Sequence, residues 1–162
     1  MKTLLISIQA FLFFTVLTGI VYPLLVTGIA QIVFPAKANG SLLTKDNNII
    51  GSALIGQQFN GDKYFTPRPS AVSYNPLPSG GSNYGLTNAK LKQQINERKE
   101  QFITSNQLDN SSIIPSEMLF ASASGLDPHI SKQAAMLQVN RIVKARGFST
   151  DEHKQLIGCI NR

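Results

Sequence analysis

The sequence predicts an α+β protein in which one N-terminal transmembrane helix, residues 1–35, precedes a small mixed soluble domain, residues 36–162. Three observations lead to this prediction. Residues 3–35 contain no charged side chain, whereas charges are frequent in the rest of the chain. Later segments space their apolar residues as amphipathic helices do. Between the anchor and these helices lies a stretch rich in proline and glycine, which favours turns over a helical bundle.

The uncharged run is long enough to stay in the membrane as an anchor. A bilayer core about 30 Å thick needs about 20 apolar residues in a helix. The apolar region of a secretory signal peptide has only about 7–15 residues, so a cleaved signal is the weaker interpretation. The single Lys2 ahead of the run favours an N-terminus inside the cell and a domain outside it.

The anchor contains residues suited to packing against other membrane helices. Pro23 removes one backbone hydrogen bond and is expected to kink the helix near Gly19 to Tyr22. Nearby hydroxyl groups are candidates to satisfy the freed carbonyl: Thr15, Thr18 and Thr27. The small residues Gly19 and Gly28 allow another membrane helix to approach closely. We therefore expect Gly19, Pro23 and Gly28 to face partner helices.

Composition narrows the range of ligands expected for the soluble domain. Of the 15 Lys and Arg residues only Lys2 precedes residue 36, which leaves 14 against nine Asp and Glu. The basic residues are scattered, so we interpret them as a solvated surface and expect no nucleic acid partner. Cys159 is the sole cysteine, which excludes an intrachain disulfide. Cysteine and histidine do not cluster with metal-ligand spacing, and we expect no metal site.

The first half of the domain is expected to be mostly irregular. After a polar connector from residue 36, short strands are predicted at Leu42-Leu43 and within residues 49–59. Residues 60–88 combine four prolines and four glycines with four aromatic residues. Long loops are usually functional or disordered, and the aromatic content argues against disorder. An ordered loop surface of this kind is typical of a binding face.

The second half of the domain is expected to be helical. A helix is predicted from a cap at Thr87 or Asn88 to residue 106, followed by a helical turn after Pro115. Ser131 can cap a helix that ends at Gly147. A capping box at residues 149–152 begins a short final helix. The buried faces are expected to contain Leu91, Ile95, Phe102, Ile103, Ala135, Val139, Ile142 and Val143.

A glycine-rich turn is the first candidate site. It consists of Ser79, Gly80, Gly81, Ser82 and Asn83. Such a turn can expose backbone N–H groups to a phosphate. It lacks the lysine and spacing of a P-loop, so a tight turn with glycines at positive φ is the more common interpretation.

The second candidate is a short cluster of hydrolytic residue types. Ser122, Ser124, Asp127 and His129 include those of a catalytic triad. The glycine pattern of a nucleophile elbow is absent, and a triad converges in space rather than along eight residues. We therefore interpret the cluster as a loop-to-helix junction in which Asp127 accepts backbone N–H groups.

Arg68, between two prolines, is a third candidate because its stiff backbone can present a guanidinium to an anion. Pairing with an acidic residue inside the domain is the favoured alternative. Two other functions stay open: a membrane-anchored periplasmic hydrolase using Ser122 or Ser124 with His129, and a small-anion-binding module using Arg68 and the glycine-rich turn.

Several segments, in order and spacing, resemble one bacterial family. They are residues 51–57 with Phe59, Tyr64-Phe65, residues 68–71, 79–83 and 87–88, residues 121–131, Gln138-Val139 and residues 145–147. Together they closely resemble the C subunit of the potassium-transporting Kdp P-type ATPase. The resemblance extends from the anchor to the last helix.

The resemblance implies a non-catalytic accessory subunit of an ATP-driven potassium import complex in the bacterial inner membrane. It implies three partners: a channel-like potassium-binding subunit, an ATP-hydrolysing P-type subunit and a small F subunit. The family is associated with assembly and with raising the ATP affinity of the hydrolysing subunit, as a catalytic chaperone. This chain lacks the phosphorylated-aspartate motif of P-type pumps, so ATP and potassium are expected to be handled by the other subunits, with no cofactor bound here.

An external domain cannot touch cytosolic ATP. We therefore expect any coupling to ATP use to be indirect, through packing in the membrane. In that case the turn at residues 79–83 is a protein contact. The same role is expected for Arg68 and for the residues of the second candidate cluster.

Overall fold

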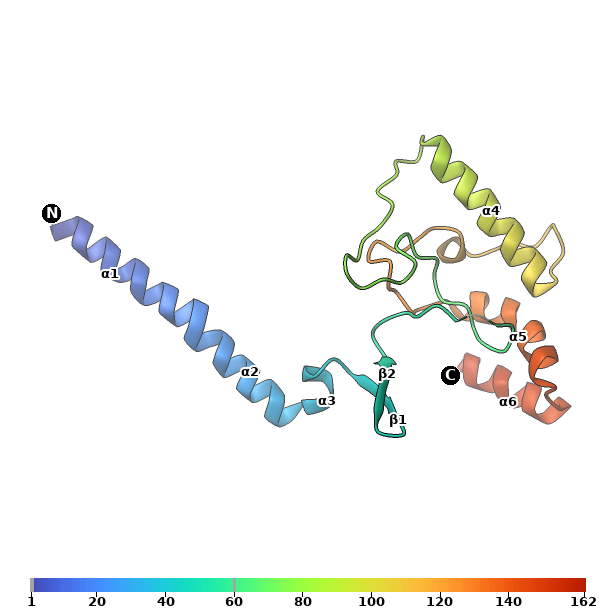
Figure 1. The fold of residues 1–162 in the computed structure, drawn as a ribbon, viewed down its shortest axis with the longest axis horizontal. Helices are drawn as coiled ribbons and strands as arrows, with labels where there is room; N and C mark the ends of the chain where they lie inside the picture. The colour runs from blue at the N-terminus through green and yellow to red at the C-terminus, as the bar shows by residue number, and fades with distance from the viewer. Residues whose placement is uncertain (1, 60) are drawn as a thin grey trace. The chain divides into compact units, whose positions relative to one another are not determined.

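The computed structural model describes residues 2–59 and 61–162, which form two compact units, Met1–Ala53 and Leu54–Arg162. Figure 1 gives the order of helices and strands along the chain. The observed α+β class, with one N-terminal apolar helix ahead of a two-stranded sheet and further helices, confirms the class predicted from the sequence.

The first unit begins with a long apolar helix in three segments. These are α1 (Lys2–Val16), a five-residue π-helix η1 (Leu17–Val21) and α2 (Tyr22–Val33). Lys2–Val33 spans 32 residues, and its most apolar stretch of 18 residues has a mean hydropathy of 2.3 and is not buried. At 1.5 Å per residue this helix is about 48 Å long, which matches a bilayer with its headgroups. It is the one helix among the described residues long and apolar enough to cross a membrane.

The predicted distortion at Pro23 takes the form of the π-helix. The Tyr22 N–H donates to the Leu17 carbonyl five residues earlier. This wider turn lies directly before the proline, whose ring would crowd an ordinary α-helical turn. The predicted role of the threonine hydroxyls is wrong for Thr15 and Thr18. They donate to the carbonyls of Phe11 and Phe14, at 2.8 and 2.7 Å, because a threonine on a helix reaches most easily one turn back.

A short helix and a hairpin complete the first unit. They are α3 (Pro35–Ala38), β1 (Leu42–Lys45) and β2 (Asn48–Ser52). The strands pair antiparallel, with Leu43 opposite Gly51 and a bulge after Leu43. Asp46 and Asn47 form the turn with φ of 49° and 64°, the conformation that fits a tight hairpin. The predicted strands are confirmed, while the connector expected from residue 36 contains α3.

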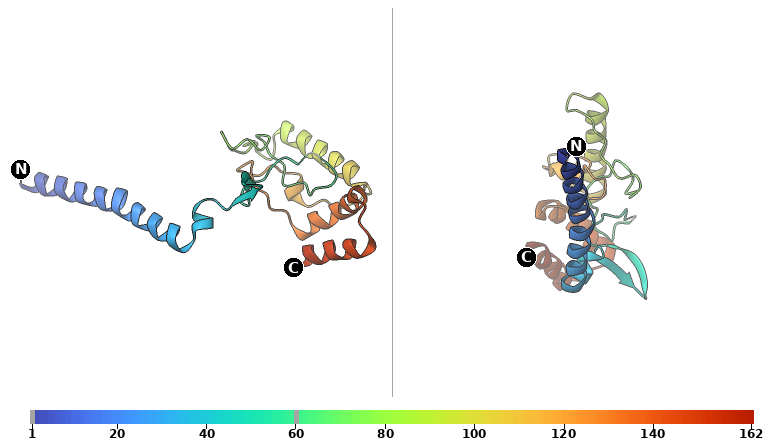
Figure 2. Two further views of the ribbon diagram at one scale, coloured as in Figure 1. Left: turned by 60° about the horizontal axis from the view of Figure 1, so that its bottom comes forward. Right: turned by 90° about the vertical axis from the view of Figure 1, so that its left-hand side faces the viewer.

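The second unit contains the remaining helices: α4 (Ala89–Asn106), the 3₁₀ turn η2 (Ser116–Met118), α5 (Lys132–Arg146) and α6 (Thr150–Asn161). Figures 1 and 2 show α6 folding back alongside α5, with which it is in contact. The buried apolar core consists of Leu91, Phe102, Ile114, Met118, Ala134, Ala135, Val139 and Ile142, of which Phe102, Ile114, Met118 and Ala134 form one cluster.

The predicted helix ends are confirmed by their hydrogen bonds. Asn88 accepts the Lys90 N–H, and Ser131 accepts the Ala134 N–H. Gly147 ends α5 at a φ of 66°. Ser149 and Glu152 form the predicted reciprocal capping box, although α6 continues to Asn161, beyond the predicted short helix.

Candidate functional site

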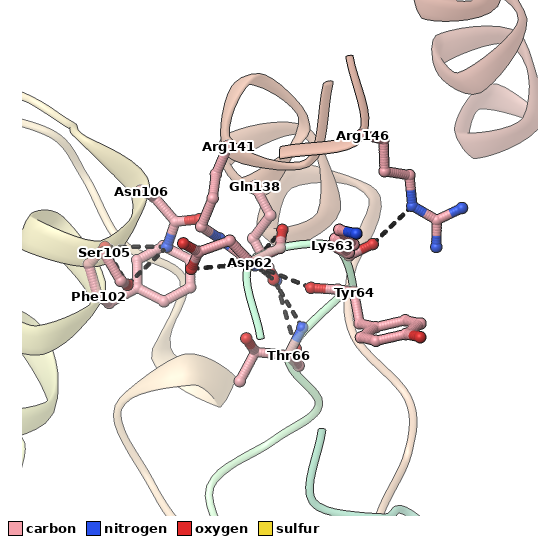
Figure 3. A network of polar contacts seen from close by, with 10 residues as sticks. All are labelled: Asp62, Lys63, Tyr64, Thr66, Phe102, Ser105, Asn106, Gln138, Arg141 and Arg146. Atoms are coloured by element: carbon pink, nitrogen blue, oxygen red, sulfur yellow. Dashed lines mark hydrogen bonds and ion pairs between the residues drawn. The ribbon is translucent and has the colours of Figure 1, made fainter. Parts of the chain in front are cut away.

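Polar side chains of α5 hold the irregular segment that follows residue 60. Gln138 is fully buried, and its Oε1 accepts the Thr66 N–H at 2.7 Å. Its Nε2 donates back to the Thr66 carbonyl at 3.3 Å. The amide therefore pairs with the backbone much as a neighbouring strand would (Figure 3). One side chain thus fixes a loop that has no sheet partner.

Arg141 extends this network to α4. Its Nε donates to Asn106 Oδ1 at 2.9 Å, and its Nη1 donates to the Asp62 carbonyl at 2.8 Å. Its Nη2 donates to the Tyr64 carbonyl and to Gln138 Oε1, both at 3.0 Å (Figure 3). Burial lowers the pKa of Arg141 from its ordinary value, but the guanidinium stays protonated at neutral pH because that ordinary value is so high. The buried cation therefore joins two helices and a loop.

Arg146 holds the same loop from the exposed end of α5. Its Nε donates to the Lys63 carbonyl at 2.7 Å, and its guanidinium lies 5.5 Å from the centre of the Tyr64 ring. Sequence reasoning missed this network. The available signal was Gln138 and Arg141, two polar residues on the face that the apolar spacing marks as buried.

Five of the predicted site residues line one open cleft with a volume of about 530 Å³. They are Arg68, Ser122, Ser124, Asp127 and His129. The expected acidic partner of Arg68 is Asp127, with Nη1 to Oδ2 at 2.9 Å. The other oxygen of Asp127 accepts the backbone N–H of His129 at 3.0 Å and lies 2.9 Å from His129 Nδ1.

The electrostatics of the cleft are nearly balanced. The backbone N–H of His129, then its side chain and Arg68, lower the pKa of Asp127, while partial burial opposes them. Asp127 is thus an anion that neutralises Arg68 at neutral pH. A free anion entering the cleft would have to compete with this internal carboxylate, which disfavours the small-anion alternative.

The serines of the cleft are not arranged as nucleophiles. Ser122 is only 2% exposed, and its hydroxyl has no hydrogen-bond partner among the described residues. The hydroxyl of Ser124 accepts the Leu126 N–H at 3.2 Å, as in a local turn. His129 bonds to Asp127 through Nδ1, but its side chain is 81% exposed and no serine hydrogen-bonds to it in the described structure. The geometry does not support the hydrolase alternative.

The glycine-rich turn packs on the backbone of this cluster. A side chain at Gly81 would lie 3.2 Å from the Ala123 carbonyl. The expectation of positive φ at Gly80 and Gly81 is wrong, since within the turn only Asn83 has it, at 54°. The close-packed position is Gly125, with φ of 68°, where a Cβ would lie 2.7 Å from the Gly80 carbonyl. Within the turn, Gly81 is needed because backbone atoms of Ala123 lie close to it, whereas a Cβ at Gly80 would meet nothing within 4 Å.

The surface beside this turn is apolar. Leu77 and Leu86 are 83% and 90% exposed, and Tyr84 between them is partly exposed. Ser79 and Asn83 are exposed, and Ser82 is half-buried. Together these residues form a loop surface, residues 77–86, that exposes large apolar side chains.

The residues predicted to pack in the membrane are accessible. Gly19, Pro23 and Gly28 are exposed, and a Cβ at either glycine would meet nothing within 4 Å.

Metal ligands do not gather in the described structure. Within residues 2–59 and 61–162, no three His, Cys, Asp or Glu residues come together in a way that could hold a metal ion.

A single apolar helix followed by a two-stranded sheet and a helical unit defines a membrane-anchored module. Comparison with known proteins makes the assignment specific. The family model for the K+-transporting ATPase c chain, KdpC, matches residues 4–160, and the chain belongs to this family.

Individual relatives agree over nearly the whole chain. The chain is 44% identical over 151 residues to a protein of Caldanaerobacter subterraneus subsp. tengcongensis, covering 93% of this chain and 78% of the relative. It is 47% identical over 160 residues to one of Pectobacterium atrosepticum, covering 97% and 83%. It is 46% identical over 158 residues to one of Mycobacterium tuberculosis, covering 96% and 84%. All three relatives are named potassium-transporting ATPase KdpC subunit.

Proposed function

We propose that this chain is a non-catalytic accessory subunit that holds a potassium-importing P-type ATPase together in the bacterial inner membrane. The observation that carries the proposal is the family match over residues 4–160, which includes both the apolar helix and the second unit. The proposed partners are the channel-like potassium-binding subunit, the ATP-hydrolysing subunit and the small F subunit.

Two surfaces support a holding role. The apolar helix exposes Gly19 and Gly28, where another membrane helix can approach closely. The loop surface of residues 77–86 exposes large apolar side chains that a soluble monomer rarely leaves uncovered. A chain that binds through two sites gains a high effective concentration at the second site once the first is bound.

In this proposal the chain supports ATP use indirectly, as a catalytic chaperone. The second unit lies outside the cell, the N-terminus lies inside, and neither ATP nor potassium is bound by this chain. The contact residues are Arg68, Ser79, Gly80, Gly81, Ser82, Asn83, Ser122, Ser124, Asp127 and His129, acting in protein contacts or in shaping the loops that make them.

Purification of the tagged full chain in mild detergent tests the proposal. We expect a channel-like membrane protein and a P-type ATPase chain to co-purify with it. Replacing Leu77 and Leu86 with Ser should reduce their recovery, whereas Lys92→Ser on the exposed side of α4 should not. Recovery of the tagged chain alone, at detergent concentrations that preserve other membrane complexes, would contradict the proposal.

Orientation is tested with Cys159, the only cysteine, which is exposed. A membrane-impermeant thiol reagent should label it in cells whose inner membrane is intact, after any outer membrane has been opened. Labelling that requires a broken inner membrane would place the second unit inside the cell.

A further inference from the structure

The second unit has another cleft, which shares no lining residue with the one that contains Asp127. Its volume is about 640 Å³. Phe102 and Met118 line it and are only 7% and 3% exposed, so the cleft reaches the core. Pro67, Pro69 and Tyr74 add further apolar surface. A volume of about 300–1,000 Å³ and a largely apolar lining are typical of sites for small organic ligands.

Hydrogen bonds hold the walls of this cleft in place. Thr66 lines the cleft, and its backbone N–H and carbonyl both bond to the buried amide of Gln138, at 2.7 and 3.3 Å. The Tyr74 hydroxyl donates to the Arg68 carbonyl at 2.8 Å, and the Tyr74 N–H donates to Ser70 Oγ at 2.9 Å. Burial raises the pKa of Tyr74, so its ring is a neutral wall at pH 7. Walls fixed in this way lose little freedom when a ligand binds.

One cation in the lining has no acidic partner. Arg98 on α4 is half-buried, and its Nη1 donates to the Leu119 carbonyl at 2.9 Å. Burial lowers the pKa of Arg98 and nearby Glu97 opposes this, so the guanidinium stays charged at pH 7. Glu97 instead accepts from Gln93 Nε2 at 2.8 Å, and no Asp or Glu in the described part of the chain forms an ion pair with Arg98. A partly desolvated cation of this kind favours a bound anion.

The polar groups of the lining indicate which anion fits. A guanidinium fork matches the two oxygens of a carboxylate. The side chains of Gln101 and Thr66 also line the cleft and form no hydrogen bond within the described residues, so both can donate to the same group. Arg98 is the one cation among the lining residues that the structure describes, which disfavours a multiply charged phosphate. The apolar walls require that the carboxylate be attached to an apolar body.

We propose that this cleft binds a small organic acid, with one carboxylate on Arg98 and an aromatic or branched aliphatic body against Tyr74 and Met118. A single acidic side chain from a partner protein would leave most of the volume unfilled, so the proposed occupant is a free acid. The inference goes beyond the holding role and does not rest on it, because every residue that carries it belongs to the second unit of this chain.

The methionines provide reporters for a direct test. Met118 lines the cleft, whereas Met136 on α5 does not and is exposed. The full chain, labelled with ¹³C in its methionine methyl groups and kept in a nonionic detergent, would be titrated with phenylacetate and observed by NMR. We expect a saturable shift of the Met118 methyl signal, no comparable shift of Met136, and binding of the uncharged phenylacetamide at least about tenfold weaker. No saturable shift, equal shifts of both methionines, or equal affinity for acid and amide would overturn the proposal.

Two variants on neighbouring positions separate the role of Arg98 from overall charge. Arg98→Gln should weaken phenylacetate binding by about tenfold or more, whereas Lys99→Gln removes an exposed cation outside the lining and should not. Equal effects of the two variants would overturn the proposal.

Gln101→Glu keeps the test decisive if Arg98→Gln fails to fold. Gln101 is exposed and forms no hydrogen bond in the described structure, so the variant should fold, and its added negative charge should weaken binding to a similar degree. Unchanged binding would overturn the proposal. If phenylacetate binds no better than its amide while Arg98→Gln lowers recovery of the pump subunits, the carboxylate belongs to a partner chain and the small-ligand proposal fails.

Discussion

The two units of this chain bury their side chains to very different extents. In the first unit, among residues 2–53, no side chain is buried, although large apolar residues are abundant there. The second unit contains the whole described core and also buries Gln138 and Arg141. The first unit therefore has no buried core of its own among the described residues, whereas the second unit is stabilised from within.

The second unit also differs in how its irregular backbone is fixed in place. The second unit uses a few buried polar side chains to fix long loops, because those loops have no strand partners. Such contacts are sensitive to single substitutions, since a lost donor leaves several buried carbonyls unsatisfied. Substitutions in the first unit should instead change assembly more than folding.

Arg141→Ala should have the largest effect on folding. It removes the donors to Asn106 Oδ1 and to the carbonyls of Asp62 and Tyr64, and we expect a loss of about 3–4 kcal/mol. Arg146→Ala removes one exposed bond to the Lys63 carbonyl and should cost less than about 1 kcal/mol. Urea unfolding of the full chain in mild detergent, followed by circular dichroism, measures both. Equal losses would mean that the buried network does not organise the unit.

Gly125→Ala should have the next largest effect, about 2–4 kcal/mol. The residue has φ of 68°, and a Cβ would lie 2.6 Å from Val72 Cγ2 and 2.7 Å from the Gly80 carbonyl. Gly147→Ala is the matched control, because its φ is 66° and nothing lies within 4 Å of the added atom. We expect the control to lose only about 1 kcal/mol, the cost of left-handed backbone. Similar losses at the two positions in the same assay would show that close packing of the turn contributes little.

Asp127→Asn should have a smaller, pH-dependent effect. The pKa of Asp127 is lowered in the folded chain, so its contribution is present above the unfolded value of about 4 and is lost as pH falls through the folded value. At pH 7 we expect a loss of about 1 kcal/mol, and a shallower decline of stability with acid than in the wild type. Asp109→Asn, on an exposed loop, is the charge-matched control. An unchanged acid slope in Asp127→Asn would contradict the assignment.

Ser122→Ala should have almost no effect, within about 0.5 kcal/mol of the wild type. The hydroxyl is buried without a partner in the described structure, so its removal loses no hydrogen bond. A large loss of stability would reveal a bond to a bound water or neighbour. A loss of hydrolytic turnover by the purified chain would instead restore the hydrolase alternative.

The sequence predicted the periodic parts of this fold better than the irregular ones. The α5 helix could be placed from Ser131 to Gly147 because cap residues and apolar spacing act locally. The position of the apolar helix could be predicted equally well, and Pro23 marked where its geometry changes. The bond between Gln138 and Thr66 joins residues 72 apart, and no local rule predicts such a pair.

The candidate site was predicted only where its contacts are local in the sequence. Asp127 and His129 are two residues apart, and their turn follows from local chemistry. The partner of Arg68 lies 59 residues away, so only the type of partner could be predicted. At Gly80 and Gly81 the reasoning from turn preference was wrong, because the contact with residues 122–125 decides where glycine is needed.

Deleting Met1–Pro35 tests most directly the claim that the first unit works through other chains and the second unit folds by itself. The shortened chain would be exported by a cleavable signal, and recovery of the ATP-hydrolysing subunit would be measured beside urea unfolding. We predict an unchanged unfolding midpoint for the second unit and a loss of recovery of about a hundredfold or more, as expected when one of two linked contacts is removed. Normal recovery without the anchor, or an unfolded second unit, would contradict this account.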